Sequence, residues 1–187
     1  MFNTFAKKSW LALGVSTFVF GLASAQAQEK VLRIAMTAAD IPRTLGQPDQ
    51  GFEGNRFTGI PMYDALTHWD LSKADAASVL IPGLASSWAV DAKDKTKWVF
   101  KLRSGVKFHD GTPFNAEAVK YNFDRCLGPE KGLKCSLHTP IIQSVEVVDD
   151  YTVKFHLKVP FAFFLNNLAH SASGIVSPTA HKKWGKD

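Results

Sequence analysis

Two adjacent residues, His109 and Asp110, form the pair in this sequence that most resembles catalytic acid–base chemistry. They lie in the run FKLRSGVKFHDGTPFNAEAVKYNFDR, residues 100–125. In a catalytic triad the imidazole and the carboxylate share a hydrogen bond. Adjacent strand residues point to opposite faces, so a strand that ends at His109 would keep the two side chains apart. Because Asp110-Gly111 is a typical turn dipeptide and no Gly-x-Ser-x-Gly motif accompanies it, we predict that the pair turns the chain.

The remaining histidines do not show the spacing of a metal site. None is followed by another four residues later, the separation that places two ligands on one helical face. Gly51 and Gly54 are not followed by the Gly-Lys-Ser/Thr ending of a phosphate-binding loop. The sequence therefore predicts neither a metal site nor a cofactor, and we expect structural or solvated roles for His68, His138, His156, His170 and His181.

The stretch from Asp40 to Glu53 is the best candidate for a binding site. It follows VLRIAM, residues 31–36, a short apolar run that suits a buried strand. Its Pro, Gly, Asp and Gln content is typical of a loop, and long loops are often functional. Ligands of open α/β sheets bind beyond the carboxyl ends of the strands, where this loop would lie. An ordinary solvated surface loop is the alternative.

Two runs of alternating apolar and polar residues predict β-hairpins that would support such loops. The first spans residues 98–108, with a turn at Ser104-Gly105 and one buried face. The second spans residues 145–157 and turns at Asp149-Asp150.

A helix is predicted between the two hairpins. Asn115 is well placed as its N-cap, and Glu117 in the first turn would complement the helix dipole. Five residues would share one face of this helix, and only one of them is polar. This face should lie against the sheet. These residues are Ala118, Val119, Asn122, Phe123 and Cys126.

The sequence contains two cysteines, Cys126 and Cys135. In an oxidising compartment a disulfide between them would contribute roughly 2.7 kcal/mol by the loop-entropy model. Gly128, Pro129 and Gly132 would let the chain turn back between the two thiols. Two independent buried thiols are the alternative, and a zinc site is disfavoured because two thiolates do not complete a tetrahedral shell.

The first 27 residues have the layout of a cleavable secretory signal. Lys7 and Lys8 precede an apolar run from Trp10 to Leu22, and small residues follow as far as Ala27. The apolar run is shorter than the roughly 20 residues that a membrane-spanning helix needs, so we favour a signal over a membrane anchor. The sequence thus predicts an exported, soluble mature protein.

Composition and charge narrow the class of protein further. Apolar residues make up 45% and aromatic residues 12% of the chain, which is typical of a globular protein. Without the two signal lysines the formal charge falls from +5 to +3. Such a mild and scattered charge lacks the basic stripe of a nucleic-acid-binding protein.

Four stretches share order, spacing and residue types with one known family. They are IPGLASSW at 81–88, KWVFKLRSGVKFHDGTPFNAEAVKYNFDR at 97–125, VEVVDDYTVKFHLKVPFAFFLNNLA at 145–169 and SPTA at 177–180. In these stretches the chain resembles the extracytoplasmic solute-binding proteins, family 5, of ABC importers for peptides, nickel and related solutes.

The resemblance implies an α/β, periplasmic-binding-protein-like fold of class II, with two lobes and an extra N-terminal subdomain. Family members are much longer than this chain, so we expect only the N-terminal portion to be present. The implied layout is a signal peptide at 1–27, the start of lobe I at 28–70, and the extra subdomain with two hairpins and a capped helix at 71–168. Residues 169–187 would return toward lobe I.

The resemblance also implies, by position, which residues contact a ligand. They are Thr37, Asp40, Gln50, Phe52, Glu53, His170 and Ser171. Asp40 and Glu53 would suit an ammonium group or an amide-rich ligand, and Phe52 would stack on an apolar part. His170 and Ser171 would donate hydrogen bonds from the opposite wall.

The implied function is capture of a short peptide or similar polar solute in the periplasm by hinge closure, without a cofactor or covalent chemistry. The binding protein would act as a monomer and deliver its solute to ABC permease subunits in the inner membrane and their ATPases. Metal chelates, opines and oligosaccharides are further solutes of the family. Two alternatives stay open: an exported hydrolase that uses His109 and Asp110, and an envelope structural protein without a small ligand.

Overall fold

The computed structural model describes residues 31, 33, 35, 60–129, 133, 135 and 139–185. All described helices and strands belong to the unit Ala35–Asp187, which is separate from the unit Met1–Ile34. The predicted signal segment and the Asp40–Glu53 loop lie outside the described residues. Within the described part, no helix combines the length and the apolar character that crossing a bilayer requires.

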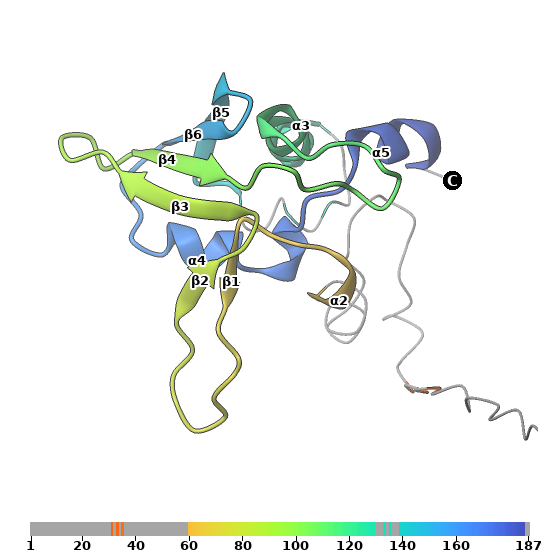
Figure 1. Ribbon diagram of the computed structural model, residues 1–187. Helices are drawn as coiled ribbons and strands as arrows, with labels where there is room; N and C mark the ends of the chain where they lie inside the picture. Colours follow the sequence, from red (N-terminus) through yellow and green to blue (C-terminus); the bar gives the residue numbers. More distant parts are fainter. Residues whose placement is uncertain are drawn as a thin grey trace, which may run out of the picture. The chain divides into compact units, whose positions relative to one another are not determined.

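The largest sheet is antiparallel and four-stranded, with the strand order β3-β4-β6-β5 (Figure 1). Its strands are β3 Ala85–Val90, β4 Lys97–Leu102, β5 Ile142–Asp149 and β6 Thr152–Leu157. β5 and β6 pair directly, and Asp149 lies opposite Thr152 next to the turn. The second predicted hairpin is therefore confirmed.

The first predicted hairpin is wrong. β4 has β3 on one side and β6 on the other, so both of its edges are already paired. Residues 106–108 instead form a loop that has one isolated bridge, between Lys107 and Pro113. The apolar alternation there has a different cause, because Val106 and Phe108 pack against the core from the loop.

The helix α3, Ala116–Leu127, confirms the predicted capped helix. The Asn115 side chain accepts a hydrogen bond from the Ala118 N–H at 3.0 Å, and Glu117 lies in the first turn. The predicted face is buried except at its last, half-buried residue; its members are Ala118, Val119, Asn122, Phe123 and Cys126.

A disulfide joins Cys126 to Cys135, with the two Cα atoms 5.6 Å apart. Cys126 belongs to the last turn of α3, and Cys135 is buried. The bond therefore fastens the C-terminal end of α3 to the chain that leads to β5.

Aromatic rings join the sheet to its helices. The ring of Phe155 on β6 lies 4.9 Å from Phe123 of α3 and 5.3 Å from Phe100 of β4, centroid to centroid. It also lies 5.4 Å from Phe164, the first residue of α4, Phe164–Leu168. All four rings are buried, so the core is centred on β6.

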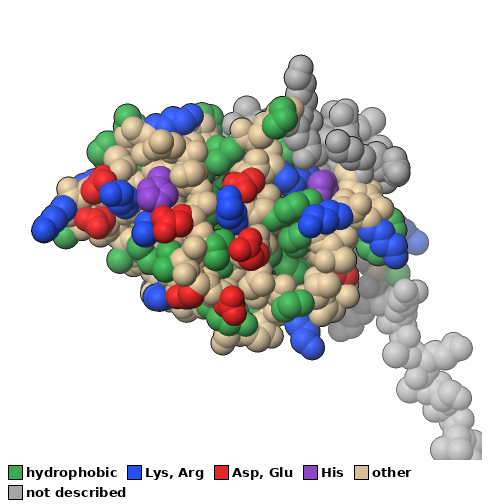
Figure 2. Space-filling model, turned by 90° about the horizontal axis from the view of Figure 1, so that it is seen from above, with side chains coloured by type: hydrophobic (Ala, Val, Ile, Leu, Met, Phe, Trp, Pro, Cys, Tyr) green, Lys and Arg blue, Asp and Glu red, His purple; other side chains and the backbone are tan. Residues whose placement is uncertain are grey.

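The opposite face of the sheet is polar. His156 Nε2 lies 2.8 Å and Lys154 Nζ 3.4 Å from the Glu146 carboxylate. Hydrogen bonds from His156 and then Lys154 hold the pKa of Glu146 below its usual value. On the face shown in Figure 2, side chains of both signs are interspersed, in agreement with the scattered charge of the sequence.

Shorter elements flank the sheet. β1 Thr67–Trp69 and β2 Leu80–Pro82 form a two-stranded ribbon that projects from it (Figure 1). The single-turn helix α2, Ile60–Met62, precedes this ribbon, and the 3-10 helix η4, Ser171–Ser173, follows α4. The last helix, α5 Pro178–Trp184, lies beside α3.

Candidate functional site

The chain between α4 and α5 carries two of the predicted ligand contacts. We define it as the return segment, residues 170–177. Residues 172–177 are all buried, although none of the described strands pairs with the segment. Because buried backbone groups need hydrogen-bond partners, these partners show what fixes the segment in place.

Two separate elements bind the middle of the return segment. The Ile175 N–H donates to the Asp64 carbonyl, in the connection between α2 and β1, at 2.9 Å. Asn122 of α3 accepts from the Val176 N–H at 3.1 Å and donates to the Val176 carbonyl at 2.8 Å. Neighbouring residues of the segment are therefore held from two directions.

Asp110 binds the end of the return segment. Its carboxylate accepts hydrogen bonds from the N–H and the hydroxyl of Thr112, at 2.9 and 2.6 Å, and from the Ser177 hydroxyl. The Ser177 oxygen also accepts from the Ala180 N–H at 3.1 Å and so caps α5. The hydrogen bonds from Ser177 and then Thr112 hold the pKa of Asp110 below its usual value. Asp110 thus fastens its own turn to the start of α5.

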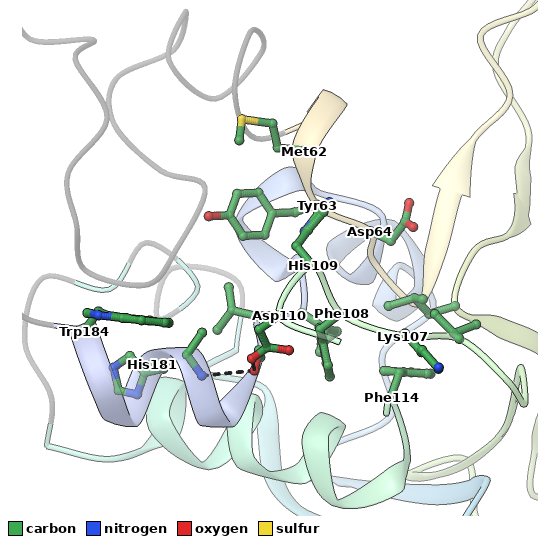
Figure 3. Close-up of a pocket in the computed structure, with 17 residues that line it drawn as sticks. Met62, Tyr63, Asp64, Lys107, Phe108, His109, Asp110, Phe114, His181 and Trp184 are labelled. Atoms are coloured by element: carbon green, nitrogen blue, oxygen red, sulfur yellow. Dashed lines mark hydrogen bonds between the residues drawn. The ribbon is translucent and has the colours of Figure 1, made fainter. Parts of the chain in front are cut away.

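The side chains of His109 and Asp110 point in different directions (Figure 3). In Figure 3, Asp110 lies over the first turn of α5, whereas His109 extends toward Tyr63. His109 is exposed, and the described hydrogen bonds of the Asp110 carboxylate do not include it. The Gly111 N–H donates to the Phe108 carbonyl at 2.9 Å, and Gly111 has φ 82°, which glycine adopts without strain. The predicted turn is confirmed, whereas the strand expected to end at His109 does not form.

A cavity of about 460 Å³ lies beside this turn (Figure 3). Its volume is within the ~300–1,000 Å³ typical of small-molecule sites. Aromatic and aliphatic side chains dominate its wall, which suits an apolar group. The lining residues include Met62, Tyr63, Asp64, Phe108, His109, Asp110, Phe114, Ile175, His181 and Trp184. The sequence did not reveal this cavity, because no local pattern connects segments so far apart along the chain.

Two of the predicted ligand contacts can be placed in the structure. His170 Nδ1 accepts a hydrogen bond from the Ala172 N–H at 3.0 Å and so caps η4, which leaves the proton of a neutral ring on Nε2. Ser171 is half-buried at the start of η4. Neither residue lines the cavity. The other predicted contacts lie outside the described residues: Thr37, Asp40, Gln50, Phe52 and Glu53.

Metal-ligating residues do not gather in the described part of the chain. No group of three or more His, Cys, Asp or Glu side chains there could hold a metal ion.

Solved structures similar to this chain include periplasmic binding proteins. AgaA from A. tumefacien R10, in complex with agropinic acid, is 30% identical with a TM-score of 0.63, over 75% of this chain and 26% of AgaA. DppA from Helicobacter pylori, in complex with the peptide STSA, is 26% identical with a TM-score of 0.61, over 75% of this chain and 30% of DppA. The chain thus has an α/β fold of the periplasmic-binding-protein class, as its sequence predicts.

Sequence comparison identifies the family. Residues 79–187 match the model of the bacterial extracellular solute-binding proteins, family 5 Middle, and the chain belongs to this family. Glutathione-binding protein GsiB of Pectobacterium atrosepticum is 42% identical over 144 residues, which cover 72% of this chain and 28% of GsiB. GsiB of Escherichia coli O1:K1 is 35% identical over 189 residues, which cover 95% of this chain and 33% of GsiB. The chain therefore spans about a third or less of the length of these relatives.

Proposed function

We propose that this chain is part of the periplasmic solute-binding component of an ABC importer. The match of residues 79–187 to family 5 carries the proposal. The signal layout of residues 1–27 supports export, and the disulfide suits an oxidising compartment. In this proposal residues 28–70 begin lobe I, residues 71–168 form the extra subdomain, and residues 169–187 return to lobe I.

The proposed solute is a short peptide or a similarly polar molecule. Relatives are named glutathione-binding proteins, and glutathione is itself a tripeptide. The related DppA structure holds the peptide STSA. In the loop after the first predicted strand, the carboxylates of Asp40 and Glu53 would pair with the ammonium group of such a solute. Phe52 would pack against an apolar side chain of the solute.

The return segment would supply the opposite wall of the site. In a neutral His170 ring Nε2 would carry the donor proton, because Nδ1 accepts from the Ala172 N–H. This proton would suit a solute carboxylate or carbonyl, as would the hydroxyl of Ser171. Thr37 and Gln50 would add hydrogen bonds from the first wall.

Capture would proceed by hinge closure. A solute that touches both lobes favours the closed state by the difference between its affinities for the two states. The closed monomer would then deliver the solute to permease subunits in the inner membrane, whose partner ATPases power import. The process includes no covalent step, which agrees with an Asp110 carboxylate engaged by Thr112 and Ser177.

Titration of the full-length protein with reduced glutathione and with Ser-Thr-Ser-Ala tests this proposal. We expect saturable binding of at least one of them by isothermal titration calorimetry, together with a change in tryptophan fluorescence on closure. The variant His109→Ala should bind equally well, because His109 lies outside the predicted ligand contacts. The proposal would be contradicted if neither these peptides nor opines, metal chelates or oligosaccharides bound.

A further inference from the structure

Asn122 is a buried polar residue on the otherwise apolar face of α3. Asn122 is only 7% exposed. A buried amide is destabilising unless it is hydrogen bonded, and an aliphatic residue would suit this face better. The hydrogen-bond partners of Asn122 therefore indicate its role.

The Asn122 amide makes three hydrogen bonds. Nδ2 donates to the Ala118 carbonyl at 2.9 Å and to the Val176 carbonyl at 2.8 Å, while Oδ1 accepts from the Val176 N–H at 3.1 Å. Because Asn122 both donates to and accepts from Val176, its side chain makes the same pair of hydrogen bonds that a residue on a neighbouring β-strand would make. Asn122 therefore fixes the backbone on both sides of the Val176 Cα atom, 54 residues away in the sequence.

The residues around Val176 leave the return segment little freedom to compensate for a shift. The Ile175 N–H is held by a backbone carbonyl at 2.9 Å, and the Ser173 hydroxyl donates to a carbonyl of α4 at 2.8 Å. Residues 172–177 are all buried. A displacement at Val176 would therefore be transmitted along the segment toward Ser171.

We propose that Asn122 is a positioning residue for solute binding. Through Val176 it holds the return segment in the register that presents His170 and Ser171 to the solute, and it does not touch the solute itself. This inference rests on the proposed function, because it takes the return segment to be one wall of the site.

Two variants separate the hydrogen bonds from the volume of the side chain. Asn122→Leu fills similar space and removes all three bonds. Asn122→Asp keeps the acceptor for the Val176 N–H, but its carboxylate faces the carbonyls of Val176 and Ala118 without a donor. Protonation restores one donor, so Asn122→Asp should recover when the pH falls to about 5, since burial raises the pKa of such a carboxyl. If Asn122→Leu does not fold, this comparison at two pH values gives the same test within one folded protein.

Asn115→Ala is the matched control, because it weakens the same helix at its N-cap, where Asn115 binds the Ala118 N–H. Hydrogen exchange measured by NMR in the full-length protein reports on the Val176 amide, and titration with reduced glutathione and Ser-Thr-Ser-Ala reports on binding. At neutral pH we expect roughly tenfold faster exchange of the Val176 amide in Asn122→Leu, which removes its acceptor, and roughly tenfold weaker binding in both Asn122 variants, each relative to the unaltered protein at the same pH; this is the scale of one or two lost hydrogen bonds. Asn115→Ala should show neither change, and Asn122→Asp should recover at low pH.

Each contrary result has a distinct meaning. Faster exchange at Val176 with unchanged affinity would overturn the positioning role and leave the proposed function intact. Equal weakening of binding in Asn115→Ala would also overturn it, because Asn122 would then act only through general stability. If the unaltered protein bound neither peptide nor any other tested solute, the proposed function would fall and this inference with it.

Discussion

The sheet core and the return segment are both buried, but different interactions hold them. Around Phe155, neighbouring rings pack at centroid distances of 4.9 to 5.4 Å. The stabilisation from such apolar burial depends little on the relative orientation of the buried groups. The return segment contributes Ile175 to the same core, but its backbone is held at Ile175, Val176 and Ser177 by hydrogen bonds that each need one particular partner. The core therefore decides whether the chain folds, whereas the hydrogen bonds decide where the return segment lies.

This difference predicts two kinds of mutant. Substitutions in the core should lower the free energy of unfolding, and solute binding should weaken together with it. Damage to the hydrogen bonds should displace the return segment and weaken solute binding, with a smaller loss of stability.

The largest effect is expected for Phe155→Ala. Removing this ring leaves a cavity among three aromatic neighbours and should lower the free energy of unfolding by about 3–5 kcal/mol, as measured by urea denaturation. Val159→Ala is the control, because Val159 is 53% exposed, and it should change the free energy by less than about 0.5 kcal/mol. Similar losses in the two variants would show that the core is not centred on β6.

Replacing both cysteines by serine should have the next largest effect. Loss of the crosslink between Cys126 and Cys135, which are nine positions apart in the sequence, should lower the free energy of unfolding by about 2–3 kcal/mol in oxidising buffer. Dithiothreitol should reduce the stability of the unaltered protein toward that of the variant and leave the variant unchanged. An equal response of both proteins to dithiothreitol would contradict the role given to this bond.

A smaller effect is expected at the start of α3. Asn115→Ala removes the cap of the Ala118 N–H and should cost about 1 kcal/mol in urea denaturation. Asn115→Asp should keep most of the stability, because a carboxylate also caps the N-terminus of a helix. Equal losses in the two variants would argue against the cap as the cause.

The smallest effect, with a defined dependence on pH, is expected for Asp110→Asn. A carboxyl whose pKa is lower in the folded state than its ordinary 3.8 stabilises the fold above that value. This stabilisation is lost as the pH falls through the folded-state pKa. Thermal unfolding should therefore show a lower melting temperature for Asp110→Asn near neutral pH, and a difference that shrinks on acidification. If the difference in melting temperature between the two proteins grew in acid, it would contradict a lowered pKa of Asp110 in the folded state.

Local patterns predicted the parts of the fold that local interactions determine. The turn at Asp149-Asp150 joins adjacent strands, and the Asn115 cap acts on Ala118, three residues away. β3 was not predicted, because a shift of register between Ala85 and Ser87 breaks its alternation of apolar and polar residues. Without β3, the sequence offered residues 106–108 as the partner of β4, which the structure does not support.

The candidate site was harder to predict because its positions depend on contacts between distant segments. The sequence marks Asn122 as an interruption of an apolar face, but it does not reveal Val176 as the partner. The same holds for Asp110, whose turn was predicted while its bond to Ser177, 67 residues away, was not. The ligand contacts expected in residues 37–53 stay predictions.

Recovery of the solute after incubation with the full-length protein tests the central claim most directly, namely that the protein captures its solute and leaves it chemically unchanged. Liquid chromatography with mass spectrometry would measure the bound and free forms of glutathione or Ser-Thr-Ser-Ala. We predict that at least one of them binds and is recovered from the denatured complex with its mass unchanged. A cleaved product that disappears in His109→Ala would contradict the account.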